Sequence, residues 1–194
     1  MKLTSIQQIN TLVNFKTTHN LRGAMISDKM ISAVLENQQQ AIKSGNPPFA
    51  AIITVDDQII ATSYNQSRSS GNPLKHAEIS AIESAIKAHG ASILQKAHLI
   101  SSNEPCPMCV GACIWSGIPK VTYFISQEQV AAIRGWGKFM PAHDIAAADD
   151  SGIVINGPID NDEMIKFHQD FWTADNNSQY KHSIHLSGSV KTET

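Results

Sequence analysis

The chain has 194 residues, a length typical of one domain with its own hydrophobic core and short for two. Hydrophobic residues make up 42%, charged residues 16%, and the formal net charge is -2. This balance argues against a strongly basic surface for nucleic acid, and no apolar stretch reaches membrane-spanning length. We expect a cytoplasmic protein, because the N-terminus lacks a basic start followed by an apolar run.

The first half of the chain predicts a helix followed by a hairpin. Residues 1 to about 20 have apolar spacing that suits a short helix, and we expect residues 1–25 to form an N-terminal extension. Ser27 is a plausible N-cap of the next helix, which ends near Gly45. The β-rich runs 49–55 and 59–64 enclose a short polar turn and predict a β-hairpin.

The second half predicts alternating helices and strands. Their ranges are a helix from His76, a strand at 97–101, a helix at 105–115, a strand at 121–125, a fifth strand at 153–155 and a last helix over 164–172. A strand, a helix and a second strand at this spacing form a βαβ unit, whose strands are parallel. Residues 176–194 are polar, and we expect a flexible tail.

Two short motifs predict a metal site. They are His76-Ala77-Glu78 and Pro105-Cys106-Pro107-Met108-Cys109, and each opens a predicted helix, where the dipole favours thiolate over thiol. Cysteines three residues apart on a first helical turn direct both sulfurs to one side. With the histidine they make three protein ligands, and such zinc sites keep an open fourth position for catalysis. We expect one catalytic zinc per chain; a redox Cys-x-x-Cys is the alternative.

The same motifs resemble those of the zinc-dependent nucleobase and nucleoside deaminases. Over residues 28–126 the chain resembles the cytidine deaminase-like superfamily, and within it the guanine deaminase branch, on His-Ala-Glu-Ile and Glu-Pro-Cys-Pro-Met-Cys-x-Gly-Ala. The resemblance implies an α/β fold, a three-layer α/β/α sandwich with a five-stranded mixed sheet. We expect this deaminase domain to cover residues 26–175.

Glu78 is the expected proton carrier of the reaction. It would take a proton from the zinc-activated water, place it on a ring nitrogen and pass a second proton to the departing ammonia. The alternative is a solvated first-turn Glu that stabilises the helix dipole. Cys113 is expected to be a buried thiol rather than a fourth ligand, and Glu104 to support the metal loop through hydrogen bonds.

The resemblance also implies residues of a substrate pocket. Asn65 matches an Asn that holds the base in relatives, although a turn residue is the alternative. Phe49 matches a ring that lines the pocket, with a core position equally open, and Ala77 is a further expected contact. Trp115, six residues after the second cysteine, is typical of guanine deaminases; a core aromatic is the alternative.

Two further expected contacts lie in the C-terminal third. Guanine deaminases use a second acidic residue and a tail that closes the pocket, in some cases the tail of the neighbouring subunit. We choose Asp144 as the acidic residue, with Asp149 and Asp150 left open, and Tyr180 as the aromatic contact of the tail. Relatives commonly dimerise, and we expect a homodimer.

We expect a hydrolase that deaminates a free purine base, most simply guanine to xanthine plus ammonia. Cytosine or nucleoside deamination and tRNA adenosine editing are alternatives with the same zinc chemistry. The last predicted helix is not basic, which argues against tRNA. A zinc-stabilised binding module is the non-enzymatic alternative, and it would be expected to lack Glu78.

Overall fold

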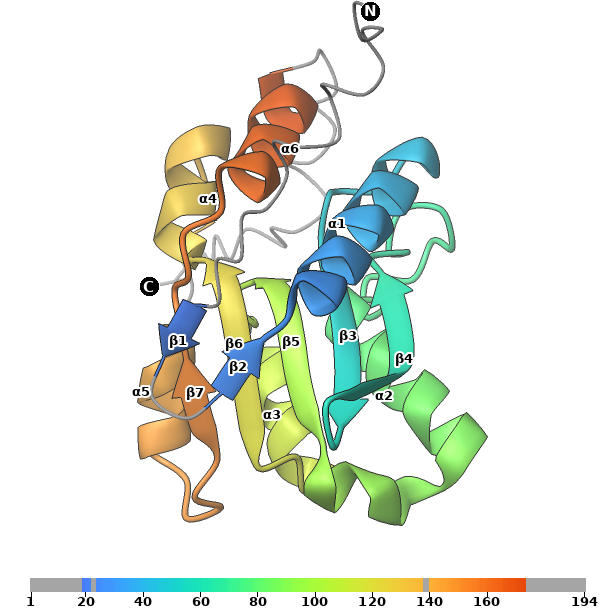
Figure 1. Ribbon diagram of the computed structural model, residues 1–194. Helices are drawn as coiled ribbons and strands as arrows, with labels where there is room; N and C mark the ends of the chain where they lie inside the picture. Colours follow the sequence, from blue (N-terminus) through green and yellow to red (C-terminus); the bar gives the residue numbers. More distant parts are fainter. Residues whose placement is uncertain (1–18, 22–23, 138–139, 174–194) are drawn as a thin grey trace, which may run out of the picture.

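A five-stranded mixed sheet lies between two layers of helices (Figure 1). The structure is a computed structural model that describes residues 19–21, 24–137 and 140–173. The strand order is β4-β3-β5-β6-β7, with ranges β3 (Ala50–Val55), β4 (Gln58–Tyr64), β5 (His98–Asn103), β6 (Lys120–Ile125) and β7 (Val154–Asn156). The expected α/β/α architecture is therefore confirmed.

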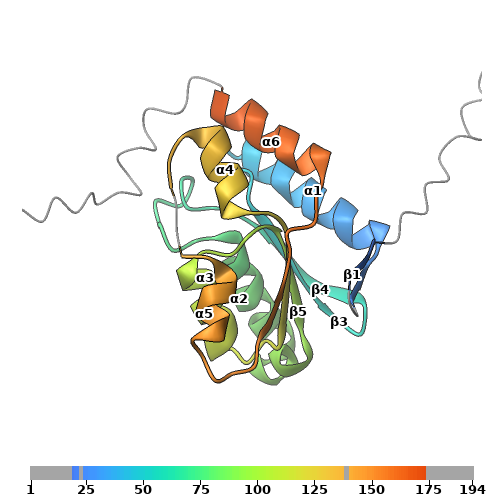
Figure 2. The same ribbon diagram turned by 90° about the vertical axis from the view of Figure 1, so that its left-hand side faces the viewer.

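The helices cover both faces of the sheet (Figure 2). One layer holds α1 (Asp28–Lys43), α4 (Gln127–Arg134) and α6 (Asp162–Thr173), and the other α2 (Ala77–His89), α3 (Pro107–Trp115) and α5 (Ala142–Ala147). Side chains alternate along each strand, so Ile52 and Ile100 pack against the first layer and Ile53 and Leu99 against the second. The central strands are thus buried on both faces.

Strand direction brings two loops to one edge of the sheet. Strand β3 is antiparallel to both β4 and β5, so β4 and β5 run in the same direction. The chain leaves the carboxyl end of β4 toward α2 and the carboxyl end of β5 toward α3. Strands β5, β6 and β7 are parallel, as the predicted βαβ unit requires. Ligand sites of α/β sheets commonly lie at this edge.

Several elements were not predicted from the sequence. They are the short helices α4 and α5, the 3-10 helix η2 (Ala91–Lys96) and a two-stranded ribbon of β1 (His19–Leu21) and β2 (Ala24–Ile26). Helix α4 has a capping box in which Ser126 and Gln129 bond each other's backbone, a signal present in the sequence. The helix expected within residues 1–25 and the tail at 176–194 fall mostly or wholly outside the described residues.

Within the described ranges, no helix combines the length and apolar character needed to cross a bilayer. The longest of these helices, α1, has 16 residues and carries charged residues at both ends.

Two histidines in or against the sheet, the half-buried His98 and the fully buried His168, have lowered pKa values. His98 lies 2.7 Å from the Thr122 hydroxyl and His168 lies 3.1 Å from the Asn103 carbonyl oxygen, each through Nε2. Burial, aided by Lys120, lowers the pKa of His98 to about 4, and burial, aided by Arg134, lowers that of His168 to about 3. Because each folded pKa lies below the ordinary 6.5, protonation favours the unfolded chain.

The fold should therefore lose stability as the pH falls below about 6.5. Between pH 6.5 and 5, His168 should account for about 2 kcal/mol of the loss, at about 1.4 kcal/mol per pH unit. Urea unfolding of the wild-type protein and of His168→Gln at pH 7 and pH 5 measures this. The stability advantage of the wild type should shrink by about 2 kcal/mol at pH 5; an unchanged difference would contradict a neutral buried imidazole.

Candidate metal centre and active site

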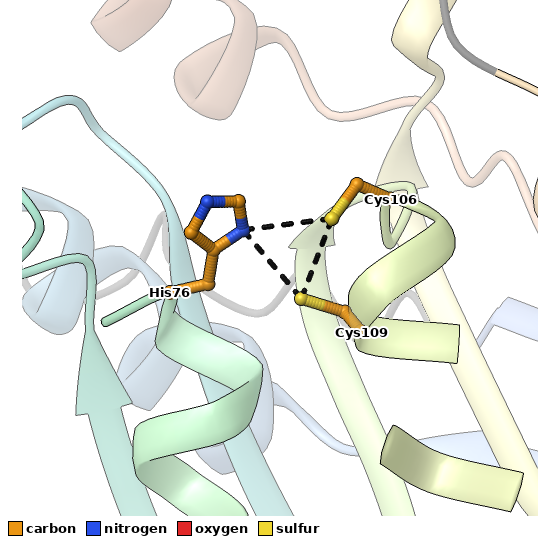
Figure 3. A group of neighbouring side chains, drawn as sticks. All are labelled: His76, Cys106 and Cys109. Atoms are coloured by element: carbon orange, nitrogen blue, oxygen red, sulfur yellow. Dashed lines mark hydrogen bonds between the residues drawn. The ribbon is translucent and has the colours of Figure 1, made fainter. Parts of the chain in front are cut away.

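The two sequence motifs begin two helices at the same sheet edge. His76 is the N-cap of α2 and Cys106 the N-cap of α3, so each lies directly before the first turn in which it was expected. Pro107 follows at a first-turn position, where the missing N–H costs no helical bond. Cys109 lies on the first turn of α3, so both sulfurs face the start of α2 (Figure 3).

The three side chains form a triangle of the size that zinc requires. His76 Nδ1 lies 3.6 Å from Cys106 Sγ and 3.5 Å from Cys109 Sγ, and the two sulfurs are 3.7 Å apart (Figure 3). Tetrahedral zinc with Zn–S of about 2.3 Å and Zn–N of about 2.0–2.1 Å needs separations of about 3.6 Å (N to S) and about 3.8 Å (S to S). The observed distances fit that geometry, and the residues can hold one zinc ion.

The charges of the triad favour a thiolate. A hydrogen bond with Cys109, together with His76, lowers the pKa of Cys106 to about 4 against the opposing effect of burial. The same hydrogen bond between the two thiol groups, together with burial, raises the pKa of Cys109. One thiolate is thus favoured by the protein alone, and a cation is needed to hold both cysteines as thiolates.

Glu78 lies directly beside the triad. Its side chain is 5% exposed, its Oε1 accepts a hydrogen bond from Ser101 Oγ at 3.0 Å, and its Oε2 lies 3.4 Å from Cys109 Sγ. Burial raises the pKa of Glu78, with His76 opposing the shift. The alternative of a solvated first-turn Glu does not match this burial. The carboxyl group is thus buried in contact with one of the two triad sulfurs.

Glu104 connects the metal-binding loop to the two short helices. Its Oε2 accepts from the backbone N–H of Gln127 at 3.0 Å, and its Oε1 from that of Ala142 at 2.8 Å. One carboxylate therefore caps the first turns of α4 and α5. Gln127 also donates to the Pro105 carbonyl at 3.2 Å, which ties the loop before Cys106 to α4.

Asn65 is buried just beyond β4, on the loop that leads to His76. Its side-chain Oδ1 accepts from the backbone N–H of Ser67 at 3.0 Å and from the Ser67 hydroxyl at 2.7 Å. Its own backbone N–H donates to the Phe49 carbonyl at 2.8 Å. Asn65 therefore shapes a turn, as the alternative reading expected, and these bonds leave its side-chain NH₂ group unused.

The remaining predicted contacts lie at different depths. Phe49 is half-buried and Ala77 is fully buried at the start of α2. Trp115 is 93% exposed at the last residue of α3, about 12 Å along the helix axis from its metal-binding end. Asp144 is exposed on α5. Tyr180 lies outside the described residues, and Asp149 and Asp150 are exposed.

The buried thiol Cys113 does not join the triad. Among the described residues, the one group of three or more metal-ligating side chains is His76, Cys106 and Cys109, whose ligand atoms lie within 4.8 Å of one another. Cys113 has no exposed surface and packs in the core between the sheet and the second helical layer. The described residues thus offer three protein ligands, and a tetrahedral ion held by them alone would have a fourth position for another ligand.

Sequence reasoning missed the polar residues at the end of β5. Ser101, Ser102 and Asn103 are all buried, and none was predicted to serve the site. Ser101 bonds Glu78, and Asn103 bonds His168 of α6, which was also missed. Three consecutive polar residues ending an apolar strand, directly before a metal motif, are a signal that points to such a role.

Known proteins match this chain over the metal-binding half. The family model described as the cytidine and deoxycytidylate deaminase zinc-binding region matches residues 25–125. Guanine deaminase from Bacillus subtilis (strain 168) is 42% identical over 89 residues, which cover 46% of this chain and 56% of that enzyme. A probable cytosine deaminase from Schizosaccharomyces pombe is 33% identical over 139 residues, which cover 69% of this chain and 85% of that relative.

A solved structure shares the fold. The crystal structure of NE0047 in complex with 2,6-diaminopurine superposes with a TM-score of 0.63 at 25% identity, covering 75% of this chain and 80% of that one. The matched family region contains both ligand-bearing motifs and the strands that bring them together. The chain belongs to the cytidine and deoxycytidylate deaminase family.

Proposed function

We propose that this protein is a zinc-dependent aminohydrolase that converts guanine to xanthine and ammonia. The observation that carries the proposal is the zinc-sized triangle of His76, Cys106 and Cys109 with the buried Glu78 carboxyl beside it. Guanine as substrate is supported by the 42% identity to a guanine deaminase and by the likeness to a protein that binds a diaminopurine.

The proposed chemistry depends on a proton carried by Glu78. His76, Cys106 and Cys109 would hold the zinc ion, which would supply a Lewis acid that makes a water molecule easier to deprotonate near neutral pH. Glu78 takes the released proton, donates it to a ring nitrogen next to the amino-bearing carbon and later passes a second proton to the leaving amino group. The Ser101 hydroxyl orients the carboxyl, and the raised pKa of Glu78 helps it keep the proton between the two transfers.

We further propose that Asn65 and Phe49 form the substrate pocket. The NH₂ group of Asn65 is free to donate to an acceptor of the base, because only Oδ1 is used by the turn. The ring of Phe49 provides an apolar wall, since it is half-buried directly before β3. Ala77 would contribute its backbone N–H, one of the free donors of the first turn of α2.

The more distant contacts and the homodimer belong to the same proposal. Trp115 is exposed and far along α3 from the triad, so any contact that it makes with substrate would be in a neighbouring copy. A homodimer would supply such a copy and would cover an indole that is otherwise in water. The contacts of Asp144 and Tyr180 with the substrate also stay predictions.

Cytosine deamination is the second candidate. It is favoured by one observation, the probable cytosine deaminase from Schizosaccharomyces pombe, which aligns with a larger share of this chain than the guanine deaminase does. The metal centre and Glu78 would serve both reactions equally. Residues outside the metal motifs therefore decide between the two bases.

Ammonia release from a panel of substrates separates these candidates. The zinc-loaded protein should release ammonia from guanine at least about 100-fold faster, in kcat/KM, than from adenine, cytosine, cytidine, guanosine or a tRNA anticodon stem-loop, because a polar pocket rejects a base whose groups leave its donors unpaired. Faster release from cytosine would replace guanine by the second candidate. No release from any of the six would contradict the proposed aminohydrolase.

Glu78→Gln should keep the zinc and lose the reaction. The amide retains the shape of the side chain but cannot carry a proton, so kcat should fall by at least about 1000-fold. Metal analysis of the variant should still give one zinc per chain, because Glu78 is not a ligand. Activity within about tenfold of the wild type would show that another group carries the proton. Glu83→Gln, exposed on the same helix, is the matched control and should be fully active.

Asn65→Asp tests the pocket separately from the turn. The carboxylate still accepts from Ser67 but has no NH₂ group, so kcat/KM for the base should fall by at least about 10-fold, the effect of one unpaired polar contact. Ser67→Ala is the control, because it removes one turn bond and keeps the NH₂ donor. Steady-state kinetics on both should show the larger loss in Asn65→Asp; the opposite order would leave Asn65 with the turn role alone.

A further inference from the structure

His168 lies where the C-terminal helix meets the end of the metal-binding strand. It is a residue of α6 with no exposed surface, and it contacts groups from two other elements. Its Nε2 lies 3.1 Å from Asn103 Oδ1 on β5, and its ring lies 5.1 Å from that of Phe49 at a tilt of 59°. It belongs to neither metal-binding motif.

The direction of the hydrogen bonds through His168 is fixed by Trp172. The indole N–H of Trp172 lies 3.1 Å from His168 Nδ1, and an indole nitrogen is only a donor. Nδ1 must therefore be the acceptor, and the proton of the neutral ring is on Nε2. Nε2 then donates to Asn103 Oδ1, which sets the orientation of that amide. Trp172 thus donates to His168, and His168 donates to Asn103.

Asn103 connects His168 to strand β5, which carries Ser101, the hydrogen-bond partner of Glu78. Asn103 is the last residue of β5, three residues before Cys106, and its Oδ1 also accepts from the Ser102 hydroxyl at 2.7 Å. Its backbone N–H lies 3.4 Å from Ser101 Oγ, the hydroxyl that donates to Glu78. The orientation of the Asn103 side chain is thus linked to the end of β5. This strand end carries Ser101, the partner of Glu78, and leads to Cys106.

The imidazole ring of His168 also contacts the ring of Phe49. The backbone carbonyl of Phe49 accepts from the N–H of Asn65. The same buried side chain therefore supports a residue on the metal side of the site and a residue on the proposed base-binding side. Leu or Val in its place would fill space but would remove the acceptor of the Trp172 indole N–H and one of the two donors to Asn103 Oδ1.

We propose that His168 is a positioning residue of the deaminase site, which holds Asn103 and Phe49 in place through its two hydrogen bonds and its ring face. This inference rests on the proposed function, because its kinetic consequence needs a reaction to measure. His168 itself neither binds the metal nor touches substrate in this account. Its effect is transmitted through the end of β5 and through the start of β3.

The test compares two substitutions of His168 with one of His98, which lies at the end of β5 opposite to Asn103. His168→Leu removes both hydrogen bonds and should lower kcat/KM by about 10- to 100-fold, the effect typical of lost partners behind a metal site. His168→Gln can accept through Oε1 and donate through Nε2, so it should recover activity to within about threefold of the wild type. Zinc content should be the same in all three proteins.

His98→Leu is the matched control. His98 is half-buried, bonds Thr122 through Nε2 and lies at the opposite end of β5 from Asn103, about 17 Å away. This variant should lower the unfolding temperature but leave kcat/KM within about threefold. An equal kinetic loss in His98→Leu and His168→Leu would overturn the inference, because it would reflect general destabilisation. Full activity in His168→Leu, or no recovery in His168→Gln, would overturn it as well.

A measurement that needs no turnover keeps the two proposals distinguishable. The imidazole nitrogen shifts of His168 in a ¹⁵N-labelled sample should show the proton on Nε2 and none on Nδ1, and the Trp172→Phe variant should change them. A proton on Nδ1 would overturn the inference even where His168→Leu fails to fold. If the wild type deaminates no base of the panel, the proposed function fails, while the tautomer and its dependence on Trp172 still decide the role of His168.

Discussion

The approach of one imidazole nitrogen and two sulfurs to within 3.5–3.7 Å is the contact on which the rest of this site depends. The two sulfurs come from one helical turn, but the imidazole comes from a second helix, 30 residues earlier. The loops before the two helices meet because β4 and β5 both run antiparallel to β3 and end at the same edge. Sheet direction thus sets the ligand geometry.

Polar groups buried beneath this edge are arranged as donors and acceptors in series. Ser101 serves Glu78, and Asn103 receives from His168, which in turn receives from Trp172. Burying such groups without partners would cost about 1–3 kcal/mol each, and most of that cost is offset here by their mutual bonds. The result is a set of buried, hydrogen-bonded side chains next to Glu78, contributed by β5 and α6, which are far apart in the sequence.

Local motifs were predictable, and long-range contacts were not. His76, Glu78, Cys106 and Cys109 form a pattern of short spacings at helix starts, which predicts the ligand set. The family resemblance that this pattern carries implies the α/β/α fold around it. His168 lies 65 residues from Asn103, and no spacing rule links an α6 histidine to a strand end. Helix α5 was missed because its six residues are too few to reveal a helical period. Exposure, as for Trp115, likewise depends on neighbours that the sequence does not specify.

X-ray absorption at the zinc edge tests the central claim, a single zinc held by one histidine and two cysteines with an open fourth position. The zinc-loaded protein should show two sulfur neighbours at about 2.3 Å and two nitrogen or oxygen neighbours at about 2.0–2.1 Å, one from His76 and one from solvent. Three or more sulfur neighbours would contradict the claim, because they would require Cys113 or another chain to close the site.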